Sequence, residues 1–113
     1  MDCIFCKIIN GKVPVDKIYE NKQIIAFCDH HPQAPVHQLI LPKKHIDTLN
    51  DLTVEDSALL GSLIQTASQL AEKAGLAKPG YRLVFNCNAD GGQLVFHIHL
   101  HLLGGRPLGW PPG

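Results

Sequence analysis

Three histidines alternate with apolar residues near the end of the chain: His97, His99 and His101, separated by Ile98 and Leu100. Successive side chains of a β-strand point to opposite faces, so this spacing predicts a strand with one buried face and three imidazoles on the other. Imidazole can act as a nucleophile, a proton carrier or a metal ligand near neutral pH. We interpret this segment as an active site. The alternative is a polar strand face that happens to be rich in histidine.

Strand geometry limits what metal these rings could share. Residues two apart on a strand are separated by roughly 6.5–7 Å, which places the outer pair about 13 Å apart. Zinc needs each ligand nitrogen at about 2.0–2.1 Å. We therefore expect at least one ring to remain free for other chemistry.

A glycine pair precedes the histidines in the segment Asp90-Gly91-Gly92-Gln93. Glycine lets backbone N–H groups approach an anion closely, and Asn86 adds a neutral donor. Such a pair is often only a turn, but its position just before the histidines favours binding of a phosphate.

Cys3 and Cys6 form a second candidate site. On a helix this spacing puts two thiols one turn apart on one face, as in zinc sites. Two more ligands are needed, and His45 is the strongest candidate from the sequence. Free thiols or a redox pair are the alternatives. We expect Cys28 and Cys87 to be buried strand residues.

Composition points to one domain with a small ligand. The 113 residues carry 10 basic and 10 acidic side chains, and no basic run exceeds Lys43-Lys44, which argues against a nucleic-acid groove. The apolar runs are far shorter than a membrane span, and we recognise no secretory signal. We therefore expect a cytoplasmic protein without a disulfide framework.

The elements that must position these residues can be predicted from periodicity and breakers. Thr53 is a suitable N-cap for an amphipathic helix of about 21 residues that ends at Gly75. A short helix and five strands are expected at 3–10, 17–19, 24–28, 37–41, 81–87 and 97–103, with a loop at 88–93. The economical architecture is an α+β fold, with one long and one short helix on a five-stranded, mostly antiparallel sheet.

The segment from His97 to Leu103 matches the signature of the histidine triad (HIT) superfamily, in which histidines alternate with apolar residues. Further similar segments lie at 5–9, 26–29, 32–37, 42–46 and 104–107. Together they resemble the HinT branch of nucleotide-binding phosphoramidases. The resemblance implies a single HIT domain over 1–113 and a homodimer in which two sheets join into ten strands. It also implies purine nucleotides bound beside the triad.

The resemblance also implies a mechanism. His99 would attack the α-phosphorus of a purine nucleoside 5′-phosphoramidate, expel an amine and leave a nucleotidyl-histidine that water cleaves. His101 would hydrogen-bond a phosphate oxygen, and His37 would support the triad. No cofactor would be required for this catalysis.

Binding roles follow from the same resemblance. Asp29 would accept hydrogen bonds from the ribose, while Asn86 and the Gly92-Gln93 backbone would hold the phosphate and leaving group. Four apolar residues would line the base pocket, or would simply be core: Phe5, Ile8, Phe27 and Leu39. Trp110, in the tail 104–113, would reach across the dimer toward the partner's site, or would belong to a disordered end.

The Cys3-x-x-Cys6 segment also resembles a subset of HIT-superfamily proteins that begin with C-x-x-C. In that subset, the resemblance implies a structural zinc held by Cys3, Cys6, His45 and the first triad histidine, His97. The chain departs from many relatives at Leu94, where they carry a serine that contacts the leaving group. It also carries His30-His31 where they have an apolar-small pair.

Other functions compete with phosphoramidate hydrolysis. One is hydrolysis of dinucleoside polyphosphates, although the Gly-Gly-Arg-Pro and Trp-Pro-Pro-Gly endings resemble the HinT branch more closely. Another is a nucleotide-sensing or scaffold protein with weak catalysis, which Leu94 favours and the intact triad opposes.

Overall fold

The computed structural model describes residues 2–113 and contains one five-stranded antiparallel sheet. The strands lie side by side in the order β1-β2-β3-β5-β4. Their bounds are β1 Lys17–Glu20, β2 Ile24–Cys28, β3 Val36–Pro42, β4 Tyr81–Val84 and β5 Leu100–Gly104. β3 and β5, which are far apart in sequence, pair at the centre with Leu39 opposite His101. The α+β fold expected from periodicity is confirmed.

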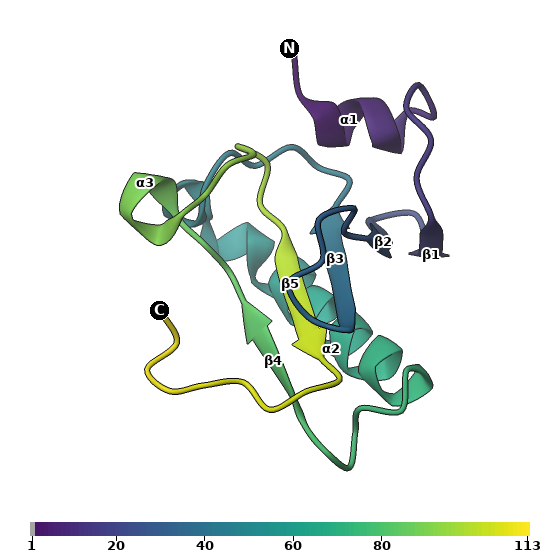
Figure 1. Cartoon of the computed structure of the whole chain (residues 1–113). Coiled ribbons are helices and arrows are strands. Elements are labelled where there is room, and N and C mark those ends of the chain that lie inside the picture. The colour runs from purple at the N-terminus through teal and green to yellow at the C-terminus, as the bar shows by residue number, and fades with distance from the viewer. Residues whose placement is uncertain (1) are drawn as a thin grey trace.

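The helices differ greatly in size and position. Figure 1 shows the long helix α2 running across one face of the sheet, while α1 stands beyond the strands near the N-terminus. The helices are α1 Ile4–Ile9, η1 Leu49–Asp51, η2 Val54–Asp56, α2 Ser57–Lys73 and α3 Asn88–Gly91. No helix among residues 2–113 has the length and apolar character needed to span a membrane.

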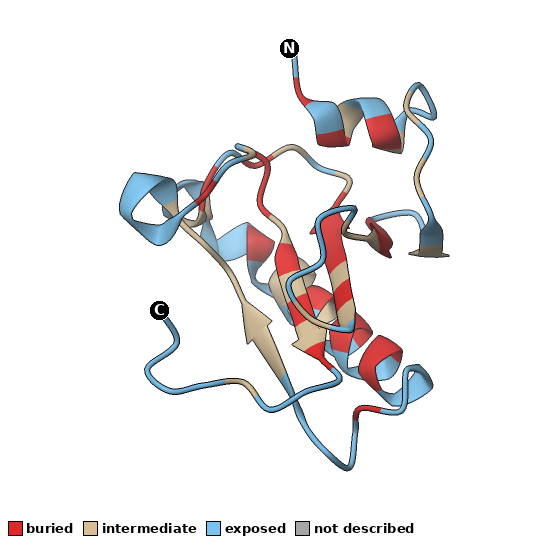
Figure 2. Ribbon diagram, viewed as in Figure 1, coloured by how far each residue is buried: buried red, intermediate tan, exposed pale blue. Residues whose placement is uncertain are grey.

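The sheet divides the core into two clusters, because alternate side chains on its central strands point to opposite faces. Ile24, Ala26 and Ile40 pack with Leu63 and other residues of α2 on one face. On the other face lie Ile25, Phe27, Leu39 and Leu41, together with Phe5, Ile8 and Cys3 from the α1 segment. Figure 2 shows buried residues on the sheet strands β2, β3 and β5, and on parts of α1 and α2. The central strands are therefore apolar at nearly every position.

The long helix is shorter than expected. Thr53 is the N-cap of the 3-10 turn η2, and α2 proper starts at Ser57 and has 17 residues. The Asp56 carboxylate accepts the Thr53 backbone N–H and also pairs with Lys44. These two contacts fix Asp56 in a tight first turn, which the apolar periodicity could not reveal.

Two strand boundaries and one loop were predicted wrongly. β4 ends at Val84, and the expected loop contains α3, held by the Gln93 side chain, which accepts the Asn88 N–H. The histidine strand begins only at Leu100, because Pro42 has no N–H to extend the ladder with β3. Instead, the Ile98 N–H donates to the Ile46 carbonyl.

The two remaining cysteines also differ from the prediction. Cys28 and Cys87 are half-buried rather than buried. Cys28 is the last residue of β2, while Cys87 lies beyond β4 and caps the N-terminus of α3. All four cysteines are unbridged.

Candidate functional site

The histidine rings gather on the α1 side of the sheet. Leu100 and Leu102 belong to the cluster under α2, whereas the His99 and His101 rings lie 4.9 Å apart between centroids on the opposite face. The edge of Phe5 contacts His99 at 4.9 Å and His97 at 5.9 Å between ring centroids. The alternation predicted by the spacing is therefore preserved, although the first two histidines precede the strand.

His99 is held in one tautomer by the main chain. Its Nδ1 lies 2.8 Å from the carbonyl oxygen of His97, and a carbonyl can only accept, so Nδ1 carries the proton. The lone pair is then on Nε2, the outer nitrogen. Burial lowers the pKa of His99, which favours the neutral ring. A neutral imidazole with one free nitrogen is chemically suited to nucleophilic attack.

His101 is oriented by a chain of hydrogen bonds that begins at a backbone amide. The Gln33 N–H donates to His37 Nδ1 at 3.0 Å, so His37 must carry its proton on Nε2. That Nε2–H donates to His101 Nδ1 at 2.9 Å. His101 Nε2 is consequently an N–H donor. Burial and the nearby His99 and His37 lower the pKa of His101 to about 4.

Asp29 lies beside this chain at the end of β2. One carboxylate oxygen accepts the His31 backbone N–H at 2.9 Å, and the other lies 3.4 Å from His37 Nε2. Asp29, His37 and His101 are close enough to suggest a metal site. The Gln33 N–H argues against it, because a metal on His37 Nε2 would need the lone pair that the tautomer places on Nδ1.

A second cluster joins Cys3, Cys6, His45 and His97, whose ligand atoms all lie within 4.8 Å of one another. The separations are 3.6 Å from Cys3 Sγ to His97 Nδ1, and 3.4 and 3.7 Å from Cys6 Sγ to the Nδ1 atoms of His45 and His97. The two Nδ1 atoms are 3.2 Å apart. A tetrahedral zinc with ordinary bond lengths requires about 3.6 Å between S and N and about 3.3 Å between the two N atoms. The four residues therefore fit zinc.

Both histidines of this cluster present the correct nitrogen. His97 Nε2 donates to the Pro42 carbonyl at 2.7 Å, and His45 Nε2 donates to the Asp47 carboxylate. Each ring must then keep its lone pair on Nδ1, the atom that faces the thiols. Sequence reasoning missed both partners. A carboxylate two residues after a candidate ligand was the available signal for Asp47, and nothing marked the Pro42 carbonyl.

The segment predicted to bind phosphate includes part of the short helix α3, and one of its side chains has a structural role. Gly92 has a φ of +82°, which glycine adopts without strain, and Gly91 approaches the backbone of the half-buried Asn86. The Gln93 amide is buried and donates to the carbonyls of Asp47 and Val95. The prediction for Gln93 concerned its backbone, which these bonds hold in place.

The four expected base-pocket residues, Phe5, Ile8, Phe27 and Leu39, all lie in the core cluster on the α1 face. Phe5 and Phe27 meet edge to face at 5.7 Å between centroids. Their packing accounts for their burial without a ligand. Contact with a base stays a prediction.

The C-terminal tail is tied to the domain at two points. Arg106 donates to the Gln33 carbonyl and Arg82 donates to the Gly109 carbonyl. Trp110 is nevertheless 83% exposed, and Leu94 is 91% exposed. Both apolar side chains are therefore available for contact with another molecule.

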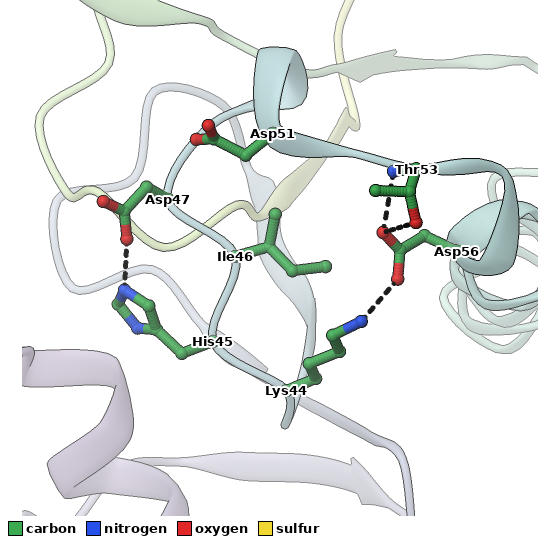
Figure 3. Close-up of a pocket in the computed structure, with 7 residues that line it drawn as sticks. All are labelled: Lys44, His45, Ile46, Asp47, Asp51, Thr53 and Asp56. Carbon is green, nitrogen blue, oxygen red and sulfur yellow. Dashed lines mark hydrogen bonds and ion pairs between the residues drawn. The ribbon is translucent and has the colours of Figure 1, made fainter.

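A cavity of about 320 Å³ lies outside the triad. Figure 3 shows its lining, where Asp47 faces His45 and the Lys44 ammonium reaches Asp56. Because these charged groups already pair with one another, we assign the chemistry to the histidines and not to this cavity.

Comparisons with known proteins agree with the geometry. The family profile of the HIT domain matches residues 10–108. The purine nucleoside phosphoramidase of Escherichia coli strain K12 is 50% identical over 108 residues, which cover 96% of this chain and 91% of that protein.

Solved structures are similar over nearly the whole chain. A HIT family hydrolase from Legionella pneumophila superimposes with a TM-score of 0.98 and 56% identity, covering 99% of this chain and 100% of that one. A histidine triad protein from Clostridium difficile has a TM-score of 0.93 and 42% identity, with 96% and 95% coverage.

Proposed function

The chain belongs to the HIT domain family, and from that premise we propose that it hydrolyses the P–N bond of purine nucleoside 5′-phosphoramidates. The observation that carries this proposal is the 50% identity to a purine nucleoside phosphoramidase over 96% of the chain. The free Nε2 of His99 supports it, because the reaction needs a neutral nucleophile.

In the proposed mechanism, His99 Nε2 attacks the α-phosphorus while Nδ1–H stays on the His97 carbonyl. The N–P bond to His99 forms as the P–N bond to the amine breaks. Water then attacks phosphorus, releasing the nucleoside monophosphate and returning the lone pair to Nε2. Positive charge developing on the ring is stabilised by the hydrogen bond at Nδ1.

The roles of His101 and His37 in this proposal follow from their tautomers. His101 Nε2–H donates to a non-bridging phosphate oxygen, and His101 or a bound water assists protonation of the leaving amine. His37 keeps His101 in the donor form. Asp29 would accept from the ribose, and Asn86 and the Gly92-Gln93 backbone would contact the phosphate and leaving group.

The experiment that tests the function is incubation with adenosine 5′-monophosphoramidate, followed by detection of AMP. Release of AMP is the expected result. Tight binding of AMP without turnover would instead favour the nucleotide-sensing function, which Leu94 in place of a serine supports. Faster cleavage of a dinucleoside polyphosphate than of the phosphoramidate would favour that alternative substrate class.

We further propose that Cys3, Cys6, His45 and His97 hold a structural zinc. When bound, the metal would supply a cross-link between α1, the segment after β3 and the residues before β5. Metal analysis of protein purified without chelator should give about one zinc per chain. Cys6→Ser should lose the zinc while Cys87→Ser keeps it, and metal-free wild type would contradict the site.

We also propose a cytoplasmic location, with which the unbridged cysteines are consistent.

A further inference from the structure

His97 takes part in two sites through two different atoms. Its ring Nδ1 lies within 3.7 Å of Cys3 Sγ, Cys6 Sγ and His45 Nδ1 in the metal cluster. Its main-chain carbonyl accepts the Nδ1–H of His99 at 2.8 Å. Because the ring and this carbonyl belong to one residue, a backbone rotation at residue 97 would move both the ring and the acceptor that holds the nucleophile.

Building on the hydrolase and zinc site proposed above, we infer that His97 is a positioning residue, through which the metal cluster locks His99 in its reactive tautomer. The cluster would then do more than stabilise the fold. It would decide whether the outer nitrogen of His99 carries a lone pair or a proton.

The ring of His97 would be fixed at both nitrogens only when a metal ion is bound in the cluster. Nε2 is held by the Pro42 carbonyl, and Nδ1 faces the ligand position. Without a cation, the lone pairs of His97 Nδ1 and His45 Nδ1 would be 3.2 Å apart, and each would have only a weakly donating thiol within reach. One end of the ring is then weakly held, although its side chain is fully buried.

The tautomer of His99 depends on a single hydrogen bond. A neutral imidazole interconverts between two tautomers unless a partner selects one. If the His97 carbonyl turns away, the Nε2–H form of His99 is populated, and its outer nitrogen can no longer attack. Loss of this hydrogen bond would therefore lower the fraction of molecules in which His99 can attack, although every catalytic side chain would still be present.

A second connection runs through α1. Cys3 precedes this helix and Cys6 lies in it, and between them is Phe5, whose ring edge contacts both His97 and His99. A helix of six residues is too short to be stable alone, and Figure 1 shows α1 standing beyond the sheet. Metal ligation would add to the core packing of Phe5 and Ile8, and would help to keep Phe5 against the nucleophile.

The test reads the tautomer directly from imidazole ¹⁵N chemical shifts, with the His99 signals assigned by their loss in His99→Gln. Zinc-loaded protein should show protonated Nδ1 and unprotonated Nε2. After chelation the His99 signals should move toward a mixture of tautomers, kcat should fall about 10–100-fold, and added zinc should restore both. Cys6→Ser should resemble the chelated protein even with zinc present, and Cys87→Ser should resemble wild type.

A single Nδ1–H tautomer of His99 in folded, zinc-free protein would overturn the inference, and so would a chain that binds no zinc. A protein that shows the tautomer change but no hydrolysis would refute the proposed function alone. If chelation unfolds the chain, the zinc affinity of the folded protein, measured by competition with a chromophoric chelator, replaces this test. Because coupling is reciprocal at equilibrium, AMP should raise the affinity for zinc about 10-fold, and an unchanged affinity would reject the coupling.

Discussion

At the scale of single residues, the tautomers of the histidines are set by groups that can only donate or only accept. The His97 carbonyl fixes His99, and the Gln33 amide fixes His37 and, through it, His101. The two catalytic candidates therefore present opposite functions to the same space. His99 offers a lone pair and His101 offers a proton, which is the pair that phosphoryl transfer to a histidine needs.

Replacing His99 with alanine tests the proposed nucleophile. Turnover of adenosine 5′-monophosphoramidate should fall by at least about 10³-fold, because no other group forms the covalent intermediate. AMP affinity, measured by calorimetry, should remain largely unchanged because the proposed ribose and base contacts do not involve His99. Substantial turnover by the variant would show that another group attacks phosphorus.

The pH profile tests the environment of His101. Its pKa is lowered to about 4, first by burial and then by repulsion from the neighbouring histidines, so the ring loses its proton well below pH 6.5. The hydrogen bond from His37 Nε2–H to His101 Nδ1 needs a neutral His101 ring, so it should persist through pH 5–6. We expect the acid limb of kcat/KM to have its midpoint below 6.5. A midpoint at or above 6.5 would contradict this description of the site.

At the scale of elements, β5 and the turn that follows it connect the site to the tail. Gly104 ends β5, and Gly105 has a φ of +94° and lies against Pro35, in the loop that precedes β3. The same loop supplies the Gln33 N–H to His37. Close packing of these two turns therefore helps to place the hydrogen-bond chain that reaches His101.

Gly105→Ala should lower the free energy of unfolding by about 1–3 kcal/mol, because φ is unfavourable for alanine and the new β-carbon would lie 2.8 Å from Pro35 Cβ. Gly109→Ala is the matched control, since its β-carbon would meet open space and its φ is ordinary. Urea unfolding compares the two. Equal midpoints would mean that the turn relaxes without cost.

At the scale of the whole molecule, the sheet leaves two open edges. Within residues 2–113, β1 and β4 each pair on one side only. Unpaired strand edges commonly recruit another strand, and two-fold symmetry would join two copies. The exposed side chains of Leu94, Phe96 and Trp110 give such a partner apolar surface to cover.

We therefore propose a homodimer and predict its mass. Light scattering at micromolar concentration should give twice the mass of one chain. The reason is that the free energy gained by strand pairing and by burial of the apolar side chains should exceed the entropic cost of association. The mass of a single chain under these conditions would refute the dimer. Removing residues 107–113, which leaves β5 and the Arg106 contact intact, should weaken the dimer if the tail reaches the partner.

Much of the molecule could be predicted because its signals are local. Alternation placed His99 and His101 on one face, and helical periodicity located α2. The four cluster residues were named from helix spacing and a family resemblance. Each of these depends on residues close in sequence or on a short motif.

The tertiary structure alone decided where the histidine strand begins and which nitrogen of each imidazole carries the proton. Pro42 lies 55 residues before His97, yet its missing N–H stops the histidine strand and its carbonyl orients the His97 ring. The Gln33 amide and the Asp47 carboxylate select tautomers in the same way. Side-chain type alone identifies an imidazole. Which of its nitrogens holds the proton depends on the partner that the fold brings to it.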